Sequence, residues 1–267
     1  MKHIIGCTTR PYGSLTFAEG CKQIAAAGYT DVAIFSSAGK IPVRTDSTKE
    51  EIAEARKTSA DAGLTPSLLI GGTKLNLGLE AAVEDYKRLI NNTAELGATW
   101  LLDGGTSNAA HYADYYELMR RAAPHAAAAG VGITLKPHGG ITLTTEDLIK
   151  AYNEVNHPAF GISYDPGNII YYTKGERRPE TDIATVAPTV STLIIKDCVV
   201  EDGKPDVMVT PGEGLVDFRK VIGGLVAGGF DGPLYVECLG GKTLDEINTN
   251  ARSTLKFVSG ILADIGR

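Results

Sequence analysis

The feature that most constrains the fold of this chain is a regular alternation of short apolar runs with longer amphipathic segments. The apolar runs recur roughly every 30 residues, which is the spacing of a repeated strand–helix unit. The runs are His3–Thr8, Val32–Phe35, Pro66–Ile70, Thr99–Asp103, Gly132–Lys136, Phe160–Asp165, Thr192–Asp197 and Leu234–Cys238. Each run is long enough for a buried strand and too short for a typical helix. The pattern therefore predicts a series of strands, each followed by a helix.

The segments between these runs have helical periodicity and are rich in good helix formers. They are Phe17–Ala27, Lys49–Ala62, Leu79–Leu96, Tyr112–Ala129, Thr145–Val155, Asp182–Ala187, Phe218–Ala227 and Leu244–Ile265. Capping signals agree with this interpretation. Thr48 and Thr144 each precede an acidic first turn, and Gly97 and Gly130 stand just past two helix ends. We therefore expect regular helices in these places.

Eight alternating units without a linker or a break in composition predict a closed (β/α)₈ barrel that spans residues 1–267 as a single domain. The length of 267 residues and the apolar content of 43% suffice for one large core. An open, doubly wound sheet is the alternative. It has less support, because the chain contains neither a Gly-x-Gly-x-x-Gly motif after the first strand nor a P-loop motif.

Charge and cysteine usage exclude several classes of partner. The net charge of −6 and the absence of any Lys/Arg run argue against nucleic acid and against a membrane surface. The apolar run near the N-terminus is too short for a signal peptide, and no apolar stretch is long enough to span a membrane. The four cysteines form no CxxC pair. We expect a cytoplasmic protein with reduced thiols.

The strand that ends at Lys136 draws attention to the carboxyl end of the barrel, where such folds carry their chemistry. Because side chains two residues apart share one face of a strand, Lys136 and His138 point the same way, into the barrel. A buried ammonium needs acidic partners or a ligand. Asp165, Asp197 and Glu237, at the ends of later strands, are the candidates. The alternative is that the lysine extends to solvent at the strand tip.

Other polar residues near the strand ends have both structural and functional interpretations. Asp165 begins the sequence Asp-Pro-Gly-Asn, so it either caps a turn or takes part in chemistry, and Asn168 can hydrogen-bond a sugar hydroxyl. Lys196 and Asp197 are adjacent at the end of one strand, where successive side chains point to opposite faces, so only one of them faces the barrel axis.

The two longest strand–helix loops also lie in the second half of the chain, at Ile169–Thr181 and Val199–Val216. Arg177 and Arg178 in the first of these either bind an anionic substrate beneath a closing loop or remain solvated.

Four motifs in the second half of the chain support a resemblance to a known family. They are Asp165–Asn168, Lys196-Asp197, Pro211–Phe218 and Gly229–Glu237. In this order they resemble the xylose isomerase-like TIM barrel superfamily of sugar phosphate isomerases and epimerases. The resemblance implies a role in carbohydrate metabolism, a small carbohydrate or sugar phosphate as substrate, and possible homo-oligomers.

The resemblance also implies a metal site, and this chain departs from it. Family members hold a divalent cation such as Mn, Zn, Co or Mg with a glutamate, an aspartate, a histidine and a glutamate from strands 5 to 8. The corresponding residues here are Lys136, Asp165, Ile194 and Glu237, so Asp165 and Glu237 alone remain as metal ligands. A protonated lysine has no lone pair for a metal. We therefore expect no cofactor, with a divalent cation as the alternative.

These observations favour a metal-independent sugar or keto-acid isomerase, epimerase or lyase. In this hypothesis Lys136 replaces the cation, Glu237 moves the proton, Asp165 balances the lysine, and His138 and Lys196 orient hydroxyl groups.

Three alternatives remain open. Lys136 can act as a Schiff-base nucleophile, as in lyases. His138, Asp165 and Glu237 can form a rearranged metal site of a metal-dependent isomerase. The barrel can also be a carbohydrate-binding protein that has lost catalysis.

Overall fold

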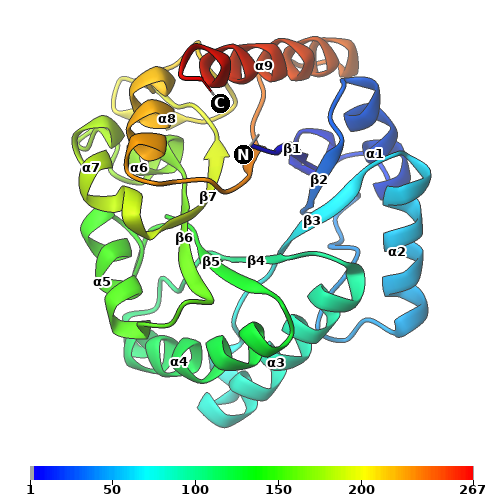
Figure 1. Cartoon of the computed structure of the whole chain (residues 1–267), viewed down its shortest axis with the longest axis vertical. Helices are drawn as coiled ribbons and strands as arrows, with labels where there is room; N and C mark the ends of the chain where they lie inside the picture. Colours follow the sequence, from blue (N-terminus) through cyan, green and yellow to red (C-terminus); the bar gives the residue numbers. More distant parts are fainter. Residues whose placement is uncertain (1–2, 267) are drawn as a thin grey trace.

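The computed structural model describes residues 3–266, and its central feature is a closed barrel of eight parallel strands (Figure 1). Around the barrel the strands follow the order β1-β10-β7-β6-β5-β4-β3-β2, so each lies beside its neighbours in the chain. Their bounds are β1 Ile5–Thr8, β2 Asp31–Ile34, β3 Thr65–Ile70, β4 Trp100–Asp103, β5 Gly132–Leu135, β6 Phe160–Tyr164, β7 Val190–Ile195 and β10 Leu234–Val236. The prediction of a (β/α)₈ barrel is confirmed.

The helices form a ring around the barrel (Figure 1). They are α1 Phe17–Ala26, α2 Lys49–Asp61, α3 Leu79–Leu96, α4 Tyr112–Ala128, α5 Thr145–Val155, α6 Pro166–Tyr172, α7 Ile183–Val186, α8 Phe218–Ala227 and α9 Leu244–Asp264. Capping boxes begin α2 and α5, where Thr48 and Thr144 accept hydrogen bonds from the third residue of each helix. Between residues 3 and 266, no helix has the length and apolar character needed to cross a membrane.

The two long loops expected after β6 and β7 contain regular structure that the sequence did not predict. The first begins with α6, because Asp165 accepts a hydrogen bond from the backbone N–H of Asn168 and so caps the helix. The second contains an antiparallel hairpin of β8 (Val199–Glu201) and β9 (Lys204–Asp206).

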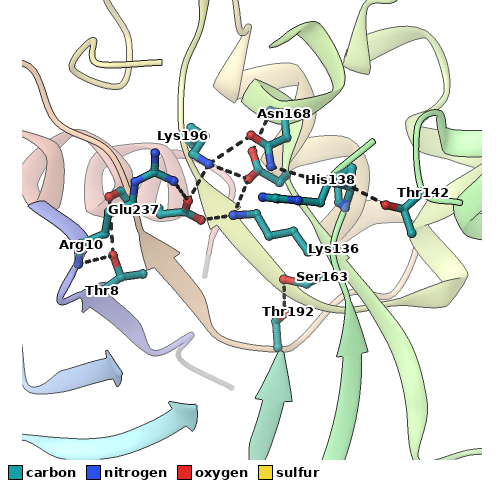
Figure 2. A network of polar contacts seen from close by, with 12 residues as sticks. Thr8, Arg10, Lys136, His138, Thr142, Ser163, Asn168, Thr192, Lys196 and Glu237 are labelled. Atoms are coloured by element: carbon teal, nitrogen blue, oxygen red, sulfur yellow. Dashed lines mark hydrogen bonds and ion pairs between the residues drawn. The ribbon is translucent and has the colours of Figure 1, made fainter. Parts of the chain in front are cut away.

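The interior of the barrel is divided into an apolar part and a polar part. A cluster of Ala33, Phe35, Leu68, Leu102, Ile194 and Tyr235 fills the apolar part. Next to it, the hydroxyl groups of Thr134, Ser163 and Thr192 hydrogen-bond one another. Charged side chains follow at the carboxyl ends of the strands (Figure 2).

Candidate functional site

Five charged side chains meet at the carboxyl end of the barrel, and we refer to Arg10, Lys136, Asp165, Lys196 and Glu237 as the ionic cluster (Figure 2). The two ammonium groups lie between the two carboxylates. The Oδ2 atom of Asp165 is 3.1 Å from the Nζ atom of Lys136 and 3.3 Å from that of Lys196. The carboxylate of Glu237 contacts Lys136 through Oε2 and Lys196 through Oε1, the latter at 2.6 Å. Arg10 donates to the same Oε1 atom at 2.7 Å.

Four members of the ionic cluster are buried and one is accessible. The side chains of Lys136 and Lys196 are 4% and 1% exposed, and both carboxylates are fully buried. The side chain of Arg10 is 43% exposed. Charges that are so deeply buried are stabilised only by one another and by hydrogen bonds. A ligand from solvent therefore meets Arg10 before it meets the lysines.

The cluster forms because each buried member comes directly after a different strand. Lys136 follows β5, Asp165 follows β6, Lys196 follows β7 and Glu237 follows β10. The close approach of α6 to β7 requires Gly167, because a Cβ atom there would overlap the backbone of Lys196. The Asp-Pro-Gly sequence thus both begins a helix and holds that helix against the second lysine.

Asp197 has a structural role on the other face of the same segment. Its carboxylate accepts hydrogen bonds from the backbone N–H groups of Cys198, Gly212, Gly214 and Val216, at 2.8 to 3.0 Å. The side chains of the adjacent residues Lys196 and Asp197 therefore point to opposite sides: the lysine points into the barrel, and the aspartate binds the loop that precedes α8.

Asn168 and His138 lie at the edge of the ionic cluster. The side chain of Asn168 donates to the backbone oxygen of Pro137 at 2.7 Å and accepts from Lys196 at 3.1 Å. The ring of His138 points toward the lysines (Figure 2) and packs against the ring of Tyr172, with the two centroids 5.2 Å apart. His138 is exposed, so this imidazole is open to solvent and lies near the buried charges.

The ionisation of these groups follows from burial and neighbouring charge. Burial favours the neutral acid of Glu237, but Lys136, Lys196 and Arg10 outweigh burial and hold the pKa of that carboxyl well below its usual range. Burial lowers the pKa of Lys136, whereas the nearby carboxylates raise the pKa of Lys196 despite its burial. Although His138 is exposed to solvent, partial burial of its ring against Tyr172 lowers its pKa, and the two lysines lower it further. His138 is therefore neutral at pH 7.

The structure does not bring Arg177 and Arg178 to the ionic cluster. Arg177 is 3.5 Å from the carboxylate of Glu146, and Arg178 contacts the carboxylate of Glu180 and the backbone oxygen of Leu215. Their role in substrate binding stays a prediction. Sequence reasoning assigned no role to Arg10, although its position after the first strand placed it at the same end of the barrel.

The donor set does not fit the divalent cation that the resemblance implies. Within residues 3–266, no group of three or more His, Cys, Asp or Glu side chains is placed to hold a metal ion. The alternative of a metal site formed by His138, Asp165 and Glu237 therefore finds no support in the geometry. Ammonium groups contact both carboxylates where a cation would have to bind.

The fold and this site define a (β/α)₈ barrel with a charged centre at the carboxyl ends of its strands. The sequence profile described as "Xylose isomerase-like TIM barrel" matches residues 21–259, and the chain belongs to this family. No protein of curated function matches the chain.

Solved structures share the fold at low sequence identity. A xylose isomerase-like TIM barrel protein from Mycobacterium smegmatis, in complex with magnesium, has a TM-score of 0.80 at 19% identity and covers 98% of both chains. A D-psicose 3-epimerase in the presence of D-fructose has a TM-score of 0.75 at 15% identity, covering 97% of this chain and 99% of its own. A 3-keto-D-glucoside 4-epimerase from E. coli has a TM-score of 0.71 at 15% identity, covering 97% of this chain and 100% of its own.

Proposed function

We propose that this protein is a sugar or keto-acid isomerase or epimerase in which a pair of buried lysines takes the place of the metal cation. The observation that supports the proposal is the contact of Lys136 and Lys196 with the same two carboxylates, Asp165 and Glu237. A substrate carbonyl that reached these ammonium groups would accept hydrogen bonds from them. The negative charge that develops on the oxygen as an enediolate forms would then be stabilised.

The proton needs a carrier other than Glu237. The low pKa of Glu237 makes its carboxylate a weak base, so we assign it the task of holding the two lysines in place. His138 suits proton transfer better, because its imidazole is neutral at pH 7, exposed, and directed toward the lysines. In this scheme the imidazole of His138 removes the proton from the carbon next to the carbonyl and delivers it to the former carbonyl carbon, while the hydroxyl proton of the first carbon passes to the oxygen of the second, so that the carbonyl moves by one carbon. Epimerisation requires instead that a second acid delivers a proton to the original carbon from the opposite face.

Hydrogen exchange tests the proposal without knowledge of the natural substrate. The protein would be incubated in deuterated water with ketoses, aldoses, their phosphates and keto acids, and deuterium next to the carbonyl would be detected by NMR. We expect exchange with at least one of these classes and, in Lys136→Met, a rate lower by a factor on the order of 10² or more. The exposed Lys57 on α2 supplies the control variant, Lys57→Met, which should keep the wild-type rate.

Two outcomes would contradict the proposal. One is measurable carbohydrate binding without exchange across the whole panel, which would favour a carbohydrate-binding barrel. The other is stoichiometric Mn, Zn, Co or Mg in the purified protein, held by Asp165 and Glu237 and removed by a chelator with loss of exchange.

A Schiff-base mechanism is the second candidate, and a difference between the two lysines favours Lys136 as its nucleophile. The ammonium of Lys196 forms ion pairs with Asp165 and Glu237 and also donates a hydrogen bond to the side-chain oxygen of Asn168. The ammonium of Lys136 meets carboxylate acceptors alone, and burial lowers its pKa. Lys136 therefore loses its proton more easily and can attack a carbonyl.

Borohydride trapping separates the two mechanisms. Incubation with a ketose or keto acid and borohydride, followed by mass spectrometry, should leave Lys136 unmodified if it acts as a cation. A reduced adduct on Lys136, absent from Lys136→Met, would instead establish the Schiff base.

A further inference from the structure

The charges of the ionic cluster do not balance. Arg10, Lys136 and Lys196 contribute three positive charges, whereas Asp165 and Glu237 contribute two negative charges, which leaves one positive charge unmatched. Asp197 follows Lys196 in the chain, but its carboxylate is occupied by the backbone N–H groups of the loop before α8. The ionic cluster therefore carries one positive charge that a bound anion would neutralise.

Arg10 places a positive charge at the solvent-exposed side of the ionic cluster, where a ligand would first make contact. Arg10 is the exposed member of the ionic cluster, and its side chain is 43% accessible. Its guanidinium uses Nη1 to donate to Glu237, and its side chain has no other hydrogen-bond acceptor among residues 3–266. Because a guanidinium has five N–H donors in a fixed plane, one edge of Arg10 remains free for a second oxyanion.

The position of Arg10 is also fixed. Its backbone N–H donates to the hydroxyl of Thr8 at 3.3 Å, and the residue begins a short 3₁₀ helix, Arg10–Tyr12, that is separated from β1 only by Thr9. The buried carboxylate of Glu237 holds the guanidinium from the inner side. By contrast, Arg177 and Arg178 already contact acidic side chains and a backbone oxygen on the surface.

We propose that this site selects oxyanionic substrates over neutral sugars, and that the free edge of the Arg10 guanidinium binds the carboxylate or phosphate of the substrate. The inference rests on the proposed function for the location of the substrate. It adds the chemical class, a small polyhydroxy compound with a carboxylate or phosphate close to the reacting carbonyl. Arg10 then acts as a specificity-determining residue, while the lysines contact the carbonyl end.

A matched set of unreactive ligands tests the inference. Erythritol, erythronate and erythritol 4-phosphate share a four-carbon polyol, and none has a carbonyl group that could react. Titration calorimetry at low salt would measure each dissociation constant. We expect at least one anion to bind at least about tenfold more tightly than erythritol, because charge-assisted hydrogen bonds to arginine are strong. Comparison of erythronate with the phosphate shows which oxyanion is preferred.

Variants of Arg10 connect the preference to this side chain. In Arg10→Gln, the dissociation constants of the anion and of erythritol should differ by no more than about threefold. Arg10→Lys retains the positive charge but lacks the planar guanidinium group, so the preference for the anion over erythritol should fall to an intermediate value. Arg219 is exposed and pairs with Asp264 on the outer surface, so Arg219→Gln is the matched control and should keep the full preference.

Clear results would overturn the inference. Equal binding of erythritol and both anions to the wild type is one, and an undiminished preference in Arg10→Lys or in folded Arg10→Gln is another. Because these ligands do not react, failure here is distinct from failure of the proposed function. Hydrogen exchange without an anion preference contradicts the inference alone, and an anion preference without exchange contradicts the proposed function alone.

Discussion

Single residues decide which group at the carboxyl end of the barrel can move a proton. Glu237 accepts contacts from three cationic side chains, so its carboxylate releases its proton readily and takes one up poorly. His138 has the opposite character, because burial and the two lysines disfavour its charged form. Environments that push the pKa values of neighbouring groups apart are typical of sites that transfer protons.

The first prediction at this scale concerns pH. The ordinary pKa of His138 is 6.5, and its pKa in the folded protein is lower. A neutral imidazole is needed to accept a proton, so the rate of hydrogen exchange should be constant near pH 7 and fall as the pH drops below 6.5. His138→Gln should lower the rate by about 10²-fold or more and remove this acidic limb.

The measurement is a pH–rate profile in deuterated water on wild type and variant. The control is His125→Gln. His125 lies on α4, away from the ionic cluster, and its side chain is hydrogen-bonded to Asn91 of α3 on the outer surface. An unchanged profile in His138→Gln would assign the proton transfer to another group.

At the scale of structural elements, the loop between β9 and α8 depends on a single carboxylate. Asp197 accepts four backbone N–H groups, three of which belong to Gly212, Gly214 and Val216. Gly214 lies so close that a Cβ atom there would overlap the carboxylate of Asp197. The Pro-Gly-Glu-Gly motif thus folds around Asp197.

The prediction at this scale is that Asp197→Asn loosens the loop. An asparagine side chain has one acceptor oxygen, and its NH₂ group would face backbone N–H donors. Unfolding in urea should show a loss of about 1–3 kcal/mol, since buried donors lose their partner. Hydrogen–deuterium exchange should increase at residues 212–216 and remain unchanged in α3.

The control for this loop is Asp206→Asn in the hairpin. Asp206 accepts one N–H, from Met208, at an exposed position, so its loss should change the stability little. If Asp197→Asn were no more destabilising than Asp206→Asn, the loop would have to be held by other contacts.

At the scale of the whole molecule, two buried carboxyl groups at opposite ends of the barrel, Glu237 and Asp31, respond to pH in opposite directions. The pKa of Glu237 at the carboxyl end is lowered in the folded protein, so its contribution to stability is lost as the pH falls below 4.5. Asp31 begins β2 at the other end and hydrogen-bonds Ser67, whose hydroxyl also meets that of Tyr235. Burial raises the pKa of Asp31 from 3.8 to about 7.

The prediction for the whole barrel follows from the sign of the shift at Asp31. Between pH 3.8 and about 7 the carboxyl group of Asp31 is protonated in the folded protein and ionised in the unfolded chain. Its contribution to stability is therefore fully present below pH 3.8 and is lost as the pH rises toward 7. Chemical denaturation of the wild type between pH 5 and pH 8 should therefore show a decline in stability of up to about 1.4 kcal/mol per pH unit. Asp31→Asn should show a smaller decline. Equal slopes in the two proteins would mean that Asp31 remains ionised in the folded state.

Much of the fold could be predicted from the sequence because its signals are local. The period of apolar residues, together with caps such as Thr48 and Thr144, placed most strands and helices within a few residues of their observed bounds. Helix α6 was missed because Pro166 and Gly167 are typical of a turn, and the hairpin after β7 has no apolar period.

The site was predictable where strand parity applies. The alternation of side chains along a strand directed Lys136 inward and separated Lys196 from Asp197, and the structure has the expected contacts of Lys136 with both carboxylates. The alternation of side chains applies only within a strand. Arg10 lies in a 3₁₀ turn, so the direction of its side chain could not be inferred from the sequence. The orientation of Arg177 depends on Glu146, a partner distant in sequence.

The distribution of the ionic cluster along the chain has a consequence for folding. Glu237 is separated from Arg10 by 227 residues and from Lys136 by 101 residues. A growing chain therefore exposes three cations and Asp165 long before their second carboxylate has been synthesised. An intermediate that lacks β10 would have to bury two ammonium groups against one carboxylate, which is unfavourable, so those lysines remain hydrated. Closure of the barrel and burial of its charges thus become one late, cooperative step, and its rate is set by contacts between distant parts of the chain.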